Sequence, residues 1–322
     1  MSSVVGCAQS LPVDPVIARI SVGARAIRPV VGADAVWVAD AGAGTVSRID
    51  PATNRVVASV RVGDPATLLA QGCAPSSEHA YATGSFGLRA CDVPSAVSTG
   101  ASLLWATKND ADAVVAIDPR TNMVVATVPV GGNPWSLLAV GDSVWISDYD
   151  HDRVVRIDAR TQQQTAVIAD LAHGPTEFAA SADSVWVVNS RAGAVTRIDM
   201  RTNQVRAVVP LGPWPLGIAV DGDDIWVRGG STRTDGALAL IDARTDAVVG
   251  TVAAGAPMGR EGVSSLAAVP GAVWVPGVTL DRVDRSSLQV TRHIALSSYA
   301  VTAMGRELWV LDVVGQLVRL RT

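Results

Sequence analysis

The sequence predicts an all-β protein that repeats one four-stranded unit around a ring. Runs rich in Val, Ile and Thr alternate with Gly, Asp, Asn and Pro, and no apolar stripe has helical spacing. A tryptophan between apolar neighbours recurs in most copies after ~40 residues, the length of one propeller blade. A seven-bladed β-propeller of four-stranded antiparallel blades is therefore expected, with the repeated position at Trp37, Trp105, Trp145, Trp186, Trp226, Trp274 and Trp309.

The composition agrees with a folded domain and limits its partners. Of the 322 residues, 48% are hydrophobic, which is enough to bury a sizeable core. The 26 basic residues face 30 acidic ones, and the net charge of −4 argues against nucleic acid or an anionic membrane as the main partner. No apolar run approaches the roughly 18 residues of a membrane span.

Each unit is expected to hold strands A to D, counted outward from the axis. In the third unit these are residues 136–140, 143–147, 154–158 and 165–169. A turn of the form Asp-x-x-Thr-polar joins C to D, where the Asp and Thr side chains can cap free backbone N–H groups. These residues are therefore expected to be structural, in turns that begin at Asp50, Asp118, Asp158, Asp199 and Asp242.

The two ends of the chain predict how the ring closes. The last unit stops after strand C at residues 317–320, and residues 16–22 match the missing strand D. Pairing these segments would leave no open edge. The expected organisation is a tail over residues 1–15 and one propeller over residues 16–322. Over that range the repeat resembles the YVTN-type seven-bladed propellers of bacteria, a resemblance that implies the fold and says little about function.

The gap between Trp37 and Trp105 leaves room for an insertion in blade two, at about residues 71–99. We expect it between strands A and B. A disulfide between Cys73 and Cys91 would fix this loop, and the alternative is two unpaired buried thiols in a cytosolic protein. The third cysteine lies in Val4-Val-Gly-Cys7, which resembles the end of a bacterial lipoprotein signal.

Only six residues precede Cys7, without a basic or an apolar region, so the lipidation match is either genuine on a longer precursor or due to chance. If it is genuine, the protein is tethered outside the cytoplasmic membrane, where disulfides persist. An extracytoplasmic location is therefore expected, with a cytoplasmic one as the alternative.

The loops that join D to the next A, and B to C, are expected on one face around the central channel, and this is the usual ligand face. Several of these loops depart from the repeat. We expect them to bind a small molecule, glycan or peptide over blades three to six, with Trp135 and Trp214 supplying apolar area and an arginine pairing an acidic group. The alternative is that both Trp rings plug the channel mouth. The candidate ligand-binding residues are Trp135, Trp214, Tyr149, Arg228, Arg260, Glu261 and Tyr299, and His151, His173, Glu177 and Arg228 are the catalytic candidates.

Asp148, Asp150 and Asp152 have the alternating spacing of a calcium loop. Arg153 at the sixth position and Ala159 at the twelfth exclude an EF-hand, which leaves a looser Mg²⁺ or Ca²⁺ site. No other cofactor is expected.

In blade length the chain also resembles the virginiamycin B lyases. That resemblance implies histidines directly after the blade prolines, a Glu in a B to C loop, and magnesium. The positions after the prolines hold Ala66, Trp135, Thr176 and Leu216 instead, and the corresponding B to C positions hold no His or Glu. This lyase activity is therefore not expected.

The favoured interpretation is a non-catalytic, monomeric binding propeller of the bacterial cell envelope. The second is a metal-assisted lyase or hydrolase in which His151 or His173 is the general base, Glu177 or the three aspartates hold the cation, and Arg228 stabilises negative charge. The third is a structural or surface-antigen repeat without a small ligand.

Overall fold

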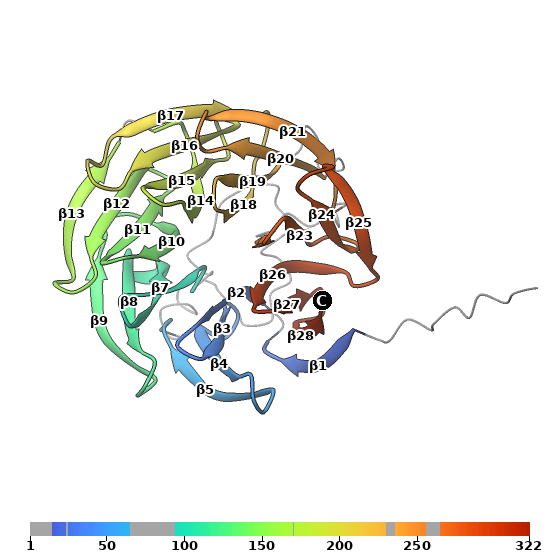
Figure 1. The fold of residues 1–322 in the computed structure, drawn as a ribbon. Coiled ribbons are helices and arrows are strands. Elements are labelled where there is room, and N and C mark those ends of the chain that lie inside the picture. The colour runs from blue at the N-terminus through green and yellow to red at the C-terminus, as the bar shows by residue number, and fades with distance from the viewer. Residues whose placement is uncertain (1–14, 24, 65–93, 170, 230–235, 256–264) are drawn as a thin grey trace, which may run out of the picture.

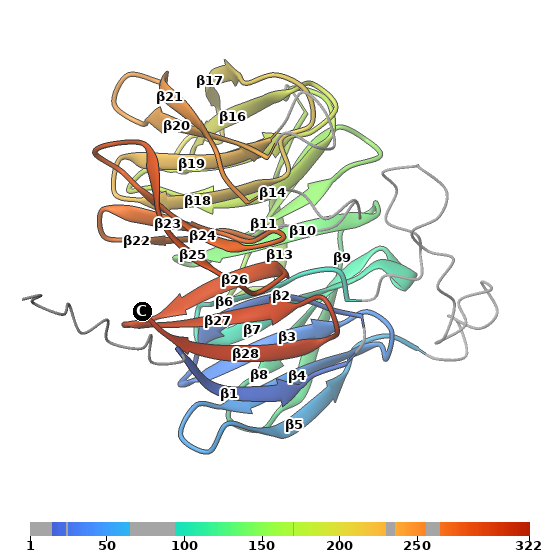
Figure 2. The same cartoon turned by 90° about the vertical axis from the view of Figure 1, so that its right-hand side faces the viewer.

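The computed structural model describes residues 15–23, 25–64, 94–169, 171–229, 236–255 and 265–322. These residues form seven four-stranded antiparallel sheets arranged as blades around a central axis (Figure 1). The predicted fold is confirmed. In the side view the ring is a disc, and the C-terminus lies on one of its two faces (Figure 2).

In blades one to six the four strands follow one another in chain order from the axis outward. Blade one is β2 (Ala26–Gly32), β3 (Ala35–Asp40), β4 (Thr45–Asp50) and β5 (Arg55–Arg61); blade two is β6 (Val97–Gly100), β7 (Leu103–Lys108), β8 (Ala113–Asp118) and β9 (Met123–Pro129). Blade three is β10 (Pro134–Val140), β11 (Ser143–Asp148), β12 (Arg153–Asp158) and β13 (Gln163–Ile168); blade four is β14 (Pro175–Ala180), β15 (Ser184–Asn189), β16 (Ala194–Asp199) and β17 (Val205–Pro210). Blade five is β18 (Gly217–Asp221), β19 (Asp224–Gly229), β20 (Ala237–Asp242) and β21 (Ala247–Ala253); blade six is β22 (Ala267–Val269), β23 (Ala272–Val275), β24 (Leu280–Asp284) and β25 (Gln289–Ile294). Blade seven is β26 (Ser298–Met304), β27 (Glu307–Asp312), β28 (Gln316–Arg321) and β1 (Val16–Ser21).

The ring closes as the sequence predicts. Strand β1 is the outermost strand of blade seven and pairs antiparallel with β28, from Val16 opposite Leu320 to Ser21 opposite Gln316. Blade seven therefore joins both ends of the propeller in one sheet, and β28 is hydrogen-bonded to a strand along each of its two edges, β27 and β1.

The insertion lies elsewhere than the sequence suggested. Strand β6 begins at Val97, inside the range assigned to the insertion, and only residues 101 and 102 separate it from β7. The extra chain therefore connects β5 of blade one to β6 of blade two, not strand A to strand B. Strand β6 has four residues, of which only Val97 is apolar, so its pattern was too weak to place this boundary.

The seven repeated tryptophans lie between blades. Each is at most 1% exposed. The buried apolar residues fall into seven clusters, and each cluster contains one of these rings packed against residues of two adjacent blades. Trp105 of blade two, for example, packs with Leu137 and Ile146 of blade three. The core is therefore a ring of interfaces, and the repeated tryptophans are structural.

The predicted turns between strands C and D are confirmed. In the turn after β12, Asp158 Oδ1 accepts hydrogen bonds from the N–H groups of Arg160 and Thr161, at 2.9 and 2.8 Å. The fifth residue of each turn has a positive φ, for example 61° at Asn203, and Asn and Asp adopt this left-handed conformation more readily than most residues. This explains why four of the five copies end on Asn or Asp; the third copy has Gln162 there.

An arginine contact between blades accompanies these turns and was not foreseen from the sequence. Arg156 lies over the Trp145 ring, at 4.8 Å from its centroid, and donates to the carbonyl of Met200 and to Asn203 Oδ1 in the C–D turn of blade four, both at 2.7 Å. The same contact joins further pairs of neighbouring blades, through Arg48, Arg197 and Arg319.

Candidate binding site at the channel face

Four of the seven innermost strands are bulged near the point where they enter the blade. Register shifts occur in β2, β10, β14 and β26, whereas the pairings of β6, β18 and β22 are regular. A bulge leaves a residue unpaired and re-aims its side chain, and bulges are common beside functional sites. The chemistry-bearing residues at the four bulges are Arg28, Trp135, Glu177 and Tyr299.

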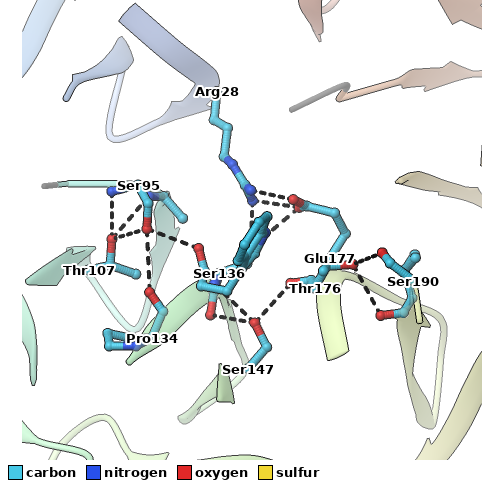
Figure 3. A network of polar contacts seen from close by, with 12 residues as sticks. Arg28, Ser95, Thr107, Pro134, Ser136, Ser147, Thr176, Glu177 and Ser190 are labelled. Atoms are coloured by element: carbon cyan, nitrogen blue, oxygen red, sulfur yellow. Dashed lines mark hydrogen bonds and ion pairs between the residues drawn. The ribbon is translucent and has the colours of Figure 1, made fainter. Parts of the chain in front are cut away.

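Arg28 and Glu177 form an ion pair across the central channel (Figure 3). Arg28 Nη1 donates to Glu177 Oε2 at 2.6 Å, and Nη2 pairs with the other carboxylate oxygen. Arg28 belongs to blade one and Glu177 to blade four, and their strands β2 and β14 are not neighbours in the ring. The pair therefore spans the channel rather than one inter-blade interface.

Ser136 of blade three completes this contact. Its hydroxyl accepts a hydrogen bond from Arg28 Nη1 at 2.7 Å and lies 3.3 Å from Glu177 Oε2, to which it can donate. We call Arg28, Ser136 and Glu177 the channel triad. Three blades thus contribute one residue each to a single polar cluster.

Burial sets the electrostatics of the channel triad. Arg28 is 6% exposed, and removal from water raises the pKa of the Glu177 carboxyl, a shift that the charge of Arg28 opposes. Arg28 Nε is also buried and has no hydrogen-bond partner among the described residues. The Arg28 backbone has φ of 49°, which is uncommon for a residue with a side chain. The fold thus holds the triad together at an energetic cost.

Buried hydroxyl groups fix the inner strands beneath the channel triad (Figure 3). Ser95 Oγ donates to the carbonyl of Trp135 at 3.0 Å, which ties blade two to blade three. Ser147 Oγ donates to the carbonyl of Thr176 at 2.9 Å, and Ser190 Oγ to that of Pro215 at 2.7 Å. The first two bonds reach the bulged segments of β10 and β14, and the third reaches the connection that leads into β18, so the neighbouring blade positions each of these segments.

An aromatic stack lies beside the channel triad, on the chain segment that precedes Ser136. The Trp135 and Tyr149 ring centroids are 4.9 Å apart with the planes tilted by 33°. The guanidinium of Arg191 covers the Tyr149 ring at 4.1 Å from its centroid. Tyr149 is buried, whereas Trp135 is half-buried and Arg191 is exposed. Trp135 and Arg191 are therefore the more exposed members of this stack, and Arg191 also pairs with Asp152 at 3.7 Å.

His173 and Asp152 lie next to Arg191. His173 Nδ1 is 2.8 Å from Asp152 Oδ2, and the N–H of Gly174 donates to Oδ1 at 2.7 Å. Burial opposes ionisation of Asp152, but the hydrogen bonds from His173 and Gly174 outweigh it and lower the pKa of this carboxyl. The His173 side chain is 77% exposed, so the carboxylate orients an imidazole that water and ligands can reach.

The structure does not assemble the predicted cation site at Asp148, Asp150 and Asp152. Asp148 is 1% exposed, and its carboxylate contacts His151 Nδ1 and Arg153 Nε. Asp150 instead contacts Asn133, and Asp152 contacts His173. Among the described residues, no group of three or more His, Cys, Asp or Glu side chains could hold a metal ion. Alternating spacing failed here because Asp148 is the last residue of β11 and faces inward.

The remaining candidates are dispersed. Arg228 donates to the carbonyls of Pro276 and Gly255, at 2.7 and 2.5 Å, and these bonds connect blade five to blade six. Burial lowers the pKa of Arg228 to about 10. Trp214 is 41% exposed on the entry to blade five. Tyr299 lies at the bulge of β26. Arg260, Glu261, Cys7, Cys73 and Cys91 lie outside the described residues.

Sequence reasoning missed Arg28, Ser136 and Arg191. Arg28 lies at the seventh D to A connection, where the N-terminal strand β1 leads into blade one, and the repeat is harder to recognise there because the two strands belong to opposite ends of the ring. That connection was the available signal. No pattern in the sequence links Arg28 to Glu177, which lies 149 residues away.

Comparisons with known proteins bear on the fold. No family model matches the chain, and no curated protein matches it in sequence. The structure is similar to virginiamycin B lyase from Staphylococcus aureus, with a TM-score of 0.71 and 12% identity over 93% of this chain and 95% of that one. It is also similar to hydrazine synthase of Kuenenia stuttgartiensis, with a TM-score of 0.70 and 11% identity over 100% and 99% of the two chains.

A third similar structure is the β-propeller domain of Cps50 (Swd1) from Myceliophteria thermophila, with a TM-score of 0.72 and 11% identity over 96% of this chain and 99% of that one. At such identities the likeness shows the seven-bladed fold alone, and membership of the YVTN-type family stays a prediction. No helix in the described part of the chain is long and apolar enough to cross a membrane.

Proposed function

We propose that this protein is a binding propeller whose small-molecule, glycan or peptide ligand rests on the channel face at Trp135. One observation carries the proposal: the inner strands bulge at Arg28, Trp135 and Glu177, in three different blades, where Arg28 meets Glu177 and Trp135 directly precedes Ser136, the third residue of that contact. Regular strands would keep all their backbone hydrogen bonds. Bulges at three inner strands therefore indicate a functional site rather than a structural requirement.

The proposed site is narrower than the sequence suggested. It comprises the Trp135–Tyr149–Arg191 stack with the channel triad beside it. Arg228 is left out because its guanidinium holds two backbone carbonyls. Trp214 is left out because it lies in the connection that leads into blade five, two blades away from Trp135 in blade three.

A thermal-shift screen against a defined set of small molecules, oligosaccharides and short peptides tests this function. Compounds that stabilise the wild-type protein should lose about tenfold or more in affinity with Trp135→Ala, because an aromatic contact contributes on the order of 1–3 kcal/mol. Trp214→Ala is the matched control, since it also removes a partly exposed indole. Equal binding by wild type and Trp135→Ala would contradict the proposal.

A hydrolase or lyase is the second candidate, and the His173–Asp152 contact favours it. A carboxylate on Nδ1 fixes the tautomer that leaves Nε2 as a proton acceptor, as a general base requires. If ligands found in the screen are turned over, His173→Gln should abolish turnover while binding persists. Turnover that survives this substitution would exclude His173 as the base.

A further inference from the structure

The channel triad is a contact that the fold holds under strain. Its three residues lie at or directly after bulges, and Arg28 has a left-handed backbone. Its guanidinium is buried, and Nε lacks a hydrogen-bond partner in the described structure, whereas Nη2 is engaged by the ion pair with Glu177. Each feature costs free energy. The free-energy difference between this contact and an arrangement in which Arg28 is exposed to water is therefore reduced.

We propose that the Arg28–Glu177 pair is a proton-sensitive clasp across the channel, which opens when Glu177 takes up a proton and Arg28 then leaves the channel for water. Opening would free the inner ends of blades one and four and uncover the stack at Trp135. The effect on ligand binding rests on the proposed function. The clasp itself does not, and it is tested without a ligand.

The chemistry of the pair supports this behaviour. A neutral Glu177 can still accept a hydrogen bond, but it no longer compensates the guanidinium charge, and an uncompensated buried charge is strongly unfavourable. Burial raises the pKa of Glu177 from its ordinary 4.5, so protonation begins at a higher pH than for exposed glutamates. The hydrogen bond from Ser136 favours the ionised form and opposes that shift.

Other charged groups on the surrounding elements are already engaged with their own partners. Around β14, Asp148 at the end of β11 contacts His151 and Arg153, and Asp221 at the end of β18 accepts from the N–H of Gly271. The titratable groups on the elements around β2 are Asp40, Tyr299, Glu307 and Asp312. Asp40 accepts hydrogen bonds from the N–H groups of Gly42 and Ala43. Glu307 pairs with Arg319, and Asp312 pairs with Arg19. Burial also raises the pKa of Asp40, which makes this residue a necessary control.

Acrylamide quenching of tryptophan fluorescence gives a direct readout. The seven repeated tryptophans are at most 1% exposed, so in a Trp214→Phe background the quenchable signal comes from Trp135. As the pH falls from about 7.5 through the raised pKa of Glu177, the quenching constant should rise roughly twofold or more. Glu177→Gln should show the high value at every pH. A pH response in Glu177→Gln equal to that of the Trp214→Phe parent would overturn the proposal.

Further variants keep the test decisive if Glu177→Gln does not fold. Ser136→Ala removes a hydrogen bond that favours ionised Glu177, so it should move the transition to higher pH. An unchanged midpoint would contradict the clasp. Asp40→Asn and the double variant His151→Gln/His173→Gln should retain the transition, and its loss in either would assign the proton to those residues and overturn the proposal.

Discussion

Replacing Arg319 by Ala should destabilise the protein by loosening the junction that closes the ring. Arg319 of blade seven donates to the carbonyl of Pro51 at 2.5 Å and to Asn54 Oδ1 at 2.8 Å in the C–D turn of blade one. It also pairs with Glu307 and lies 5.1 Å from the Trp309 ring centroid. These contacts are partly buried, since the arginine side chain is 17% exposed.

The magnitude follows from these contacts. The two hydrogen bonds to blade one contribute about 1 kcal/mol each, the partly exposed pair about 0.5 kcal/mol and the cation–π contact about 0.5 kcal/mol. Neighbouring contacts are not additive, so we expect a loss of about 2 kcal/mol. For a domain of this size that corresponds to roughly 3 °C in Tm.

Equilibrium urea unfolding and calorimetry measure this loss. Arg120→Ala is the matched control, because the Arg120 side chain is 88% exposed and, among the described residues, pairs within its own turn with Asp118 alone. Its loss should stay below about 0.5 kcal/mol. Arg156→Ala, which makes the same contact between blades three and four, should behave like Arg319→Ala. If Arg319→Ala is no more destabilising than Arg120→Ala, the contribution assigned to the inter-blade arginines is wrong.

Two further predictions concern the turns and the repeated tryptophans. The pKa of the Asp242 carboxyl is lowered to about 2 by hydrogen bonds from the side chain and the N–H of Arg244. The pKa of the Asp284 carboxyl is also lowered to about 2, by the hydroxyl and N–H groups of Ser286 and Ser287. The stabilisation that the two ionised carboxylates give is therefore present above the ordinary pKa near 3.8 and is lost as the pH falls toward 2. Urea unfolding should show that the free energy of unfolding declines over this pH range, and Asp242→Asn should reduce the decline. Trp186→Ala should cost about 3–5 kcal/mol of unfolding free energy by opening a cavity between blades four and five. Trp214→Ala should change this free energy by less than about 0.5 kcal/mol, and equal losses would contradict the assignment of Trp186 to the core.

The sequence was sufficient for the fold because the fold is periodic. Each blade repeats a buried ring, a capped turn and β-branched strands, so a single unit predicts the others and the incomplete last unit predicts the closure through β1. The start of blade two was misplaced because only one of the four residues of β6, Val97, is apolar, and so short a strand carries little of this pattern.

The candidate site was only partly predictable, because it is built where the repeat fails. Trp135 and Glu177 were found as departures from the period, but a bulge is a property of pairing geometry and leaves no mark in the sequence. The contact of Glu177 with Arg28 joins residues from opposite sides of the ring, and the acidic triplet was separated because one of its members faces inward. Local spacing carries no information about either arrangement.

A double-mutant cycle between Arg28 and Glu177 tests the channel contact most directly. Unfolding free energies of wild type, Arg28→Met, Glu177→Gln and the double variant give the coupling between the two side chains at about pH 7.5. For a buried pair across the channel we predict a coupling of about 2–4 kcal/mol. A coupling below about 0.5 kcal/mol would contradict the contact, and with it the account of the channel face as a site assembled from three blades.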